Sequence, residues 1–288
     1  MTSKNKILIL GVSGMLGNTL YRYFRNNTEN IIVGVSRNLI SAGSMFQTEK
    51  ATLEFGFEAE NIDALTRILN KHRPDIVINC VGIIKQKATS EDPLFALHIN
   101  SLLPHRLNQL CTLLGSRLIH ISTDCVFSGQ KGMYKEDDVP DARDLYGTSK
   151  LLGEVVGSKT LTLRTSLIGH ELDSSNSLVN WFLSRNENIQ GYRKAIFSGL
   201  PCVEVASIIN NFVIPDQSLN GLMHLSVEPI DKYLLLSIIK SVYGKNIEIE
   251  KDNTVMLDRS LDSSYFRRRT GYVPPSWKDL ITAMRNFH

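Results

Sequence analysis

A tyrosine and a lysine four residues apart, Tyr146 and Lys150, have the types and the spacing for proton transfer. Both lie in a segment with a helical pattern, where side chains four apart are neighbours on one face. A positive charge near a phenol favours the phenolate, so we expect Lys150 to lower the pKa of Tyr146. Such a tyrosine can exchange a proton with a carbonyl or an alcohol near neutral pH.

Three polar residues, Ser122, Thr123 and Asp124, end the apolar run that precedes this helix. In an open α/β sheet, the end of a strand and the start of the next helix meet at the carboxyl edge, where ligands bind. Thr123 or Ser122 can therefore give a second hydrogen bond to the oxygen that Tyr146 protonates. The pattern Tyr-x-x-x-Lys occurs by chance in many chains. The evidence for a site is therefore the position of the pattern on the helix that follows this strand.

A glycine-rich turn directly after the first predicted strand suits a hydride-carrying dinucleotide. Gly11 permits a tight turn, Gly14 lets the backbone approach a pyrophosphate, and Gly17 lets the helix pack close to the strand. The helix that follows offers free N–H groups and the positive end of its dipole to the phosphates. The residues predicted to bind the cofactor here are Gly11, Ser13, Gly14, Met15, Leu16 and Gly17.

The end of the second predicted strand indicates which dinucleotide is bound. An acidic residue here would bind the ribose hydroxyls and repel a 2′-phosphate, and none is present. Ser36 and Arg37 can instead bind and neutralise a phosphate, which favours NADP(H). Taken alone, Arg37 is equally well explained as a surface residue. Further along the chain, Cys80, Val81 and Gly82 follow a predicted strand, where the small Gly82 suits a passing cofactor or simply a turn.

Alternating strands and helices must position these groups. Apolar runs occur at 6–10, 31–35, 75–81, 117–122 and 160–164, and helical patterns lie between them at about 15–26, 60–72, 93–114 and 146–157. This order predicts an α/β fold, a Rossmann-type doubly wound parallel sheet with helices on both faces. Beyond about 166 the pattern loosens. It shows helices near 176–187, 201–213 and 229–243, a strand at 221–226, a polar stretch at 250–264 and a final helix after Pro274-Pro275.

We expect residues 1–165 to form the cofactor-binding domain, with a return segment at about 195–227. Residues 166–194 and 228–288 are expected to form a smaller α/β substrate-binding lobe. The net charge of +3 and the lack of a long Lys/Arg block argue against a nucleic-acid partner. The apolar run at 7–10 is too short for a signal peptide or a membrane span.

The four cysteines, Cys80, Cys111, Cys125 and Cys202, are scattered and have no metal-ligand spacing with the histidines. They are typical of reduced thiols, so we expect a cytoplasmic protein without a metal.

Together these motifs resemble the short-chain dehydrogenase/reductase superfamily in its extended form, which acts on nucleotide sugars. Within it, the chain is most similar to the dTDP-4-dehydrorhamnose reductase family. The resemblance rests on Gly11, Gly14, Gly17, Asn100, the block Ser-Thr-Asp-Cys-Val-Phe-Ser-Gly at 122–129, Tyr146, Lys150, and the stretches 163–166 and 258–262. It spans nearly the whole chain.

The resemblance implies a role for each matching residue. Tyr146 would be the proton donor. Lys150 would lower the pKa of Tyr146 and bind the nicotinamide ribose. Thr123 would hydrogen-bond the reacting oxygen, and Asp124 would orient the sugar. Asn100 is similar to an asparagine that holds the lysine through water, although a helix-surface asparagine explains it nearly as well. The implied activity is NADPH-dependent reduction of the 4-keto group of a nucleotide-linked 6-deoxyhexose, in deoxysugar and surface polysaccharide biosynthesis.

Other functions remain open at this stage. Cys125 stands where similar 4,6-dehydratases usually carry a glutamate base, which argues for net reduction. Cys125 and His170 could exchange protons beside the ketone, as in relatives that couple 3,5-epimerisation to reduction, but a buried thiol and a loop histidine are the simpler explanation. A non-catalytic NADP-binding regulatory subunit is disfavoured by the retained Thr, Tyr and Lys.

The substrate's nucleotide diphosphate is expected in the smaller lobe. Trp181 could stack on the base and Arg259 could bind the diphosphate, although a tryptophan at helical spacing is more often a core residue. The resemblance is also compatible with a homodimer.

Overall fold

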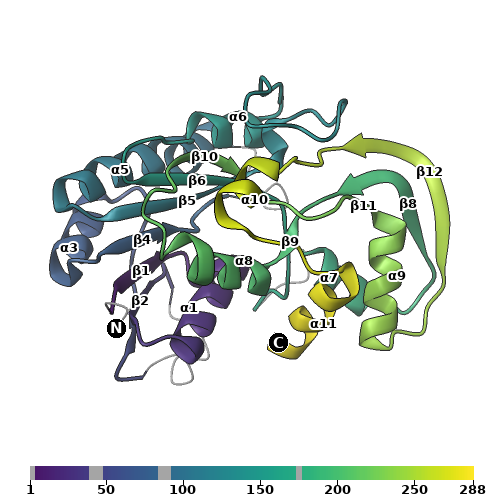
Figure 1. Ribbon diagram of the computed structural model, residues 1–288, viewed down its shortest axis with the longest axis horizontal. Helices are drawn as coiled ribbons and strands as arrows, with labels where there is room; N and C mark the ends of the chain where they lie inside the picture. Colours follow the sequence, from purple (N-terminus) through teal and green to yellow (C-terminus); the bar gives the residue numbers. More distant parts are fainter. Residues whose placement is uncertain (1–3, 39–47, 84–91, 173–176) are drawn as a thin grey trace.

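A seven-stranded sheet in which every neighbouring pair is parallel forms the centre of the molecule, in the order β10-β6-β5-β4-β1-β2-β3 (Figure 1). The computed structural model describes residues 4–38, 48–83, 92–172 and 177–288. The strands are β1 (Lys6–Leu10), β2 (Ile31–Val35), β3 (Ala51–Glu54), β4 (Ile76–Asn79), β5 (Arg117–Thr123), β6 (Thr160–Thr165) and β10 (Gly221–His224). The predicted α/β fold class is confirmed.

Helices cover both faces of this sheet because its strands bury both faces. Ile7 and Ile9 of β1 pack against α1 (Met15–Asn27) and α8 (Cys202–Ile208) with its π-helical continuation η4 (Ile209–Val213). Leu8 and Leu10 point the other way, against α3 (Ile62–His72) and α5 (Leu103–Leu114). Figure 1 shows α1 and α8 below the sheet and α5 above it.

The predicted helix at 93–114 is three consecutive segments: α4 (Pro93–Ala96), the π-helix η2 (Leu97–Leu102) and α5. Helix α6 (Leu145–Leu152) begins after Asp144, whose side chain accepts a hydrogen bond from Gly147 N at 2.9 Å. Gly153, at its other end, allows close contact with η2, because a Cβ there would lie 1.8 Å from the carbonyl oxygen of Asn100. Short π-helical segments are frequent at functional sites.

A second sheet has the order β11 (Ile230–Asp231), β8 (Ile189–Phe197) and β12 (Ile249–Asp258). Strand β8 runs antiparallel to β11 and parallel to β12. The core beside this sheet comes largely from α7 (Leu178–Ser184), α9 (Lys232–Tyr243) and α11 (Trp277–Phe287). The polar stretch at 250–264, to which no helix or strand was assigned, contains most of β12, where largely exposed residues form a strand. Strand β8 was not predicted, and neither was the four-residue edge strand β3.

The remaining elements are the parallel pair β7 (Leu167–Ile168) and β9 (Leu200–Pro201), the 3-10 helix η3 (Asp124–Val126) and α10 (Ser264–Thr270). Strand β10 joins the large sheet from within the predicted return segment. Phe266 of α10 and Leu280 of α11 also pack in the core of the large sheet. The division of the chain at residue 165 stays a prediction.

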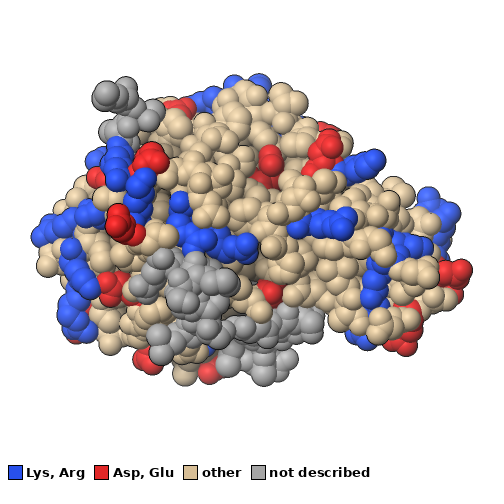
Figure 2. All heavy atoms as spheres, turned by 90° about the horizontal axis from the view of Figure 1, so that it is seen from below, with Lys and Arg blue, Asp and Glu red and all other residues tan. Residues whose placement is uncertain are grey.

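The surface seen in Figure 2 is mostly uncharged, and its basic residues lie among acidic ones. Within the described ranges, no helix is long and apolar enough to cross a membrane. The same residues contain no group of three or more His, Cys, Asp or Glu that could hold a metal ion. All four cysteines are free.

Candidate functional site

A cleft of about 470 Å³ lies between the carboxyl ends of the central strands and the second sheet. Of the residues predicted from the sequence, the cleft is lined by Met15, Leu16, Cys80, Val81, Gly82, Thr123, Asp124, Cys125, Tyr146, Lys150 and Arg259. The opposite wall includes Ile196, Phe197, Lys232 and Leu257. The parallel sheet therefore brings a glycine-rich turn, a strand end and a helix start from distant parts of the chain into one cleft.

Thr123 ends β5 and holds the residues that follow it. Its hydroxyl donates to Asp124 Oδ1 and accepts from Cys125 N, both at 3.1 Å. A side-chain hydrogen bond also joins Thr123 to Tyr146. The two side chains proposed to contact the reacting oxygen thus meet in the cleft.

Burial raises the pKa of the Tyr146 phenol above its usual value. The nearby Cys125 adds to the rise, and the hydrogen bond with Thr123 opposes it. The expectation that a lysine would depress this pKa is wrong here, because the cost of desolvating a phenolate is the largest effect. The phenol stays protonated at neutral pH, which suits a proton donor.

Lys150 lies in a dry part of the same cleft. The side chain is 5% exposed, and its ammonium donates to the carbonyl oxygen of Ile121 at 2.8 Å. Burial lowers the pKa of Lys150 to about 8, while the Glu154 carboxylate and Cys80 oppose the shift. A Cβ on Gly82 would lie 3.8 Å from the Lys150 Nζ, so a small residue keeps this space open.

Asn100 is buried on η2, so the interpretation as a helix-surface residue is wrong. Its side-chain oxygen accepts from Ile83 N at 2.9 Å, and its nitrogen donates to Ser149 Oγ at 3.1 Å. These bonds tie the turn after β4 to α6, next to Lys150. Asn100 positions the neighbours of the lysine in this way, and its predicted link through water stays a prediction.

The turn after β1 has the backbone geometry that its glycines predicted. Gly11 has a φ of 88°, and a Cβ on Gly17 would lie 2.2 Å from the Gly11 oxygen, so neither position tolerates a side chain without strain. The N-cap residue of α1 is Gly14, which has no side chain that could bond the N–H groups of the first turn. Ser13 and Gly14 are exposed, and Met15 begins the helix and lines the cleft. These residues fit a dinucleotide pyrophosphate.

Ser36 and Arg37 differ in how they are held. The Ser36 hydroxyl is buried and donates to the Asn38 carbonyl oxygen at 2.6 Å. Arg37 is exposed directly after β2, with its own carbonyl oxygen bonded to Gly56 N at 3.0 Å. The guanidinium of Arg37 is therefore the better phosphate ligand of the two. Residues 39–47 lie outside the described part of the chain.

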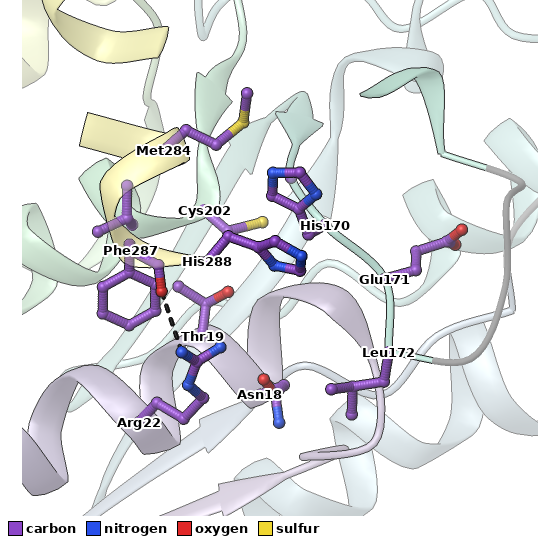
Figure 3. Close-up of a pocket in the computed structure, with 12 residues that line it drawn as sticks. Asn18, Thr19, Arg22, His170, Glu171, Leu172, Cys202, Met284, Phe287 and His288 are labelled. Carbon is purple, nitrogen blue, oxygen red and sulfur yellow. Dashed lines mark hydrogen bonds between the residues drawn. The ribbon is translucent and has the colours of Figure 1, made fainter. Parts of the chain in front are cut away.

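His170 lies outside the cleft, in a small cavity of about 50 Å³ between α1 and α11 (Figure 3). Its Nε2 hydrogen-bonds the Tyr243 hydroxyl at 2.7 Å, and its ring stacks on His288 with the ring centroids 3.8 Å apart. Burial lowers the pKa of His170 to about 4. These partners hold it away from Cys125, so the structure does not bring the proposed proton-exchange pair together in one site.

Trp181 is also absent from the cleft lining. It packs against the core of the second sheet, with the Arg185 guanidinium 5.3 Å from its ring centroid. Trp181 is therefore a packing residue, as its helical spacing favoured, and does not line the cleft.

A buried ion pair beneath the site was not predicted. The Glu154 carboxylate accepts from Arg164 Nε at 2.8 Å, Arg164 Nη2 at 2.7 Å and Ser122 Oγ at 2.7 Å. The side chains of Arg164 and Glu154 are 3% and 9% exposed. The pair joins the ends of β5 and β6 to the chain that leaves α6. An arginine within the apolar run at 160–164 was the available signal.

Lys232 is a further cleft residue that the sequence did not indicate. It opens α9, after an N-cap formed by Asp231, whose side chain accepts from Leu234 N at 2.8 Å. Its side chain lines the cleft opposite the glycine-rich turn. No motif surrounds it, and only the pairing of β11 with β8 places it there.

A family model described as the RmlD substrate binding domain matches residues 5–191. The chain belongs to this family. The dTDP-4-dehydrorhamnose reductase of Bacillus anthracis, in a crystal structure with NADP, is similar with a TM-score of 0.81. The similarity covers 99% of each chain at 23% sequence identity. The family resemblance drawn from the motifs is confirmed.

Curated relatives match a shorter part of the chain. The dTDP-4-dehydrorhamnose reductase of Streptomyces griseus is 30% identical over 148 residues, which are 51% of this chain and 43% of that protein. Methionine adenosyltransferase 2 subunit beta of Xenopus tropicalis is 27% identical over 149 residues, which are 52% of this chain and 41% of that protein. The chain thus spans only about two fifths of the length of these two relatives.

Replacing Glu154 with glutamine should leave the Arg164 charge buried and unpaired. We expect the free energy of unfolding to fall by about 3–5 kcal/mol, measured by urea denaturation. The matched control is Glu187→Gln, because the Glu187 side chain is 77% exposed and lies 3.7 Å from Arg185. That change should cost below about 1 kcal/mol. Equal stability losses for the two variants would show that the buried pair does not hold the site together.

Proposed function

We propose that the protein reduces the 4-keto group of a nucleotide-linked 6-deoxyhexose with NADPH, in deoxysugar and surface polysaccharide biosynthesis in the cytoplasm. The observation that carries this proposal is the meeting of Thr123, Tyr146 and Lys150 in the cleft that Met15 and Leu16 also line. A proton donor, a hydrogen bonder and a cation stand beside a turn that fits a dinucleotide. Membership of the RmlD substrate binding domain family supports the substrate class.

The cofactor would be held from the glycine-rich turn to Lys150. A bound nicotinamide would supply the hydride. The N-terminus of α1 suits its pyrophosphate, Arg37 suits a 2′-phosphate, and Lys150 suits the ribose hydroxyls. The crystal structure of the Bacillus anthracis relative in complex with NADP supports this assignment.

Tyr146 would give its phenolic proton to the sugar oxygen as C4 becomes an alcohol carbon. The raised pKa of Tyr146 keeps that proton in place until it is needed. A hydrogen bond from Thr123 would stabilise the charge that develops on the oxygen. The Lys150 ammonium would then stabilise the phenolate that remains, because opposite charges in a dry site attract strongly.

The direct test is turnover. The protein is incubated with NADPH and 4-keto-6-deoxyhexoses linked to dTDP, UDP or GDP, and products are identified by mass spectrometry and NMR. We expect one nucleotide to be preferred and a 4-hydroxy sugar to form for each NADPH consumed. Binding of NADPH without turnover of any member of this panel would contradict the proposal.

A second candidate is a non-catalytic NADP-binding subunit, which the matches to methionine adenosyltransferase 2 subunit beta favour. Such a protein would bind the cofactor and show no turnover in the same assay. The joint placement of Thr123, Tyr146 and Lys150 in the cleft supports the reductase over this candidate.

Arg37→Asp should change the cofactor preference. The substitution replaces a phosphate ligand by a carboxylate that repels a 2′-phosphate, so kcat/KM for NADPH should fall much more than kcat/KM for NADH. Arg67→Asp, on the exposed side of α3, makes the same change in net charge and serves as control. Equal kcat/KM for the two cofactors in the unchanged protein would contradict NADPH selectivity.

Tyr146→Phe keeps the ring but removes the proton. We expect kcat to fall by about 100-fold or more, while NADPH still binds in a fluorescence titration. Tyr192→Phe, on β8 and outside the cleft lining, removes a hydroxyl elsewhere and should leave kcat unchanged. Near-normal turnover of Tyr146→Phe would reject the proton-donor assignment.

Reaction in D₂O separates simple reduction from coupled epimerisation. Because His170 lies outside the cleft, we expect no solvent deuterium at C3 or C5 of the product. Cys125→Ser should then lower stability more than rate. Enzyme-dependent label at either carbon, above that of substrate incubated without protein, would show coupled proton exchange. In that case, loss of the label in Cys125→Ser would identify the thiol as one of its acid–base groups.

A further inference from the structure

Two cations, Lys232 and Arg259, lie on the wall of the cleft opposite the glycine-rich turn. They interact electrostatically with each other and with Asp124 and Cys125. Neither cation forms an ion pair within 4 Å among the residues that the structure describes. A half-buried ammonium without an acceptor is costly, and an anion that enters the cleft would remove that cost.

Asp124 attracts both cations, and one carboxylate cannot neutralise two positive charges. Asp124 accepts a hydrogen bond from Thr123 at 3.1 Å, and burial raises the pKa of Asp124, which disfavours its charged form. Glu171 accepts from Ser177 N at 2.8 Å and is not among the charges that act on Lys232. Figure 3 shows Glu171 pointing away from His170 and His288. This end of the cleft therefore keeps a net positive charge.

Arg259 is held in a fixed orientation while part of its guanidinium remains available. Its Nε donates to the Phe127 carbonyl oxygen at 2.8 Å, and Nη1 lies 3.8 Å from Cys125 Sγ. Cys125 is in turn close enough to Tyr146 to affect its pKa. A guanidinium in a fixed orientation can bind phosphate oxygens in a defined geometry, and an ammonium beside it adds a compact point charge.

We propose that Lys232 acts with Arg259 to bind the diphosphate of the substrate, and that Lys232 gives the site its preference for a diphosphate over a monophosphate. This inference rests on the proposed function, because it takes the ligand to be a nucleotide sugar. A diphosphate held here leaves the attached sugar beside Cys125 and within the part of the cleft that Tyr146 lines. Lys232 acts in binding and has no part in the proton transfer.

The test measures binding without turnover. Isothermal titration calorimetry with NADP⁺ present compares UDP, dTDP and GDP with the corresponding monophosphates. Lys232→Met should weaken binding of the preferred diphosphate by about tenfold or more. The monophosphate should lose far less, so the ratio of the two affinities falls. Lys232→Arg should restore part of the diphosphate affinity because it restores the charge.

Lys240→Met is the matched control, on the same helix and outside the cleft lining. It should leave every affinity unchanged, and NADP⁺ binding by Lys232→Met should match that of the unchanged protein, which shows that the variant is folded. The inference is overturned if Lys232→Met binds the diphosphate as tightly as the unchanged protein does. It is also overturned if the affinities for the diphosphate and the monophosphate fall by the same factor. In either case the reductase proposal stands. If the unchanged protein binds none of these nucleotides, both fall together.

Discussion

The parallel register of the central strands is the constraint on which the site depends. Leu10 of β1 pairs with Asn79 of β4, and Asn79 pairs with His120 of β5. The carboxyl ends of three strands that are far apart in sequence therefore meet at one edge. The glycine-rich turn, the small residues after β4 and the Thr123 strand end follow from this alignment. Packing of alternate side chains on both faces maintains it, since a slip of one residue would move each side chain to the other face and away from the helices that it packs against.

Burial then determines the chemistry of the groups that the sheet brings together. It raises the pKa of Tyr146 and lowers that of Lys150, so the phenol holds its proton and the ammonium releases its own more readily than in water. Glu154 and Arg164 stabilise the strand ends beneath them through hydrogen bonds in a dry environment. The opposite wall differs because two cations, Lys232 and Arg259, line the cleft there. One side of the cleft thus suits proton transfer, and the other suits an anion.

The sequence predicted what depends on local pattern. Continuous apolar runs identified most strands of the large sheet, and the glycine spacing with Tyr146 and Lys150 indicated the cleft. The sequence did not predict the elements and residues whose positions depend on tertiary contacts. Strand β12 has only a short apolar run because most of its residues are exposed, and Lys232 enters the cleft only through the second sheet. The pairing of His170 with Cys125 rested on analogy with relatives that couple epimerisation to reduction, whereas Tyr243 and His288 hold His170 elsewhere. The sign of the Tyr146 pKa shift depends on burial, which helix spacing does not reveal.

The transfer of hydride to the sugar carbon tests the central claim most directly. NADPH that carries deuterium at the transferable position of its nicotinamide is mixed with a 4-keto nucleotide sugar, and the product is analysed by NMR and mass spectrometry. The account predicts deuterium at C4 of the sugar, with none at the neighbouring carbons. Consumption of the substrate without deuterium at C4, or unchanged NADPH and sugar after prolonged incubation, would contradict it.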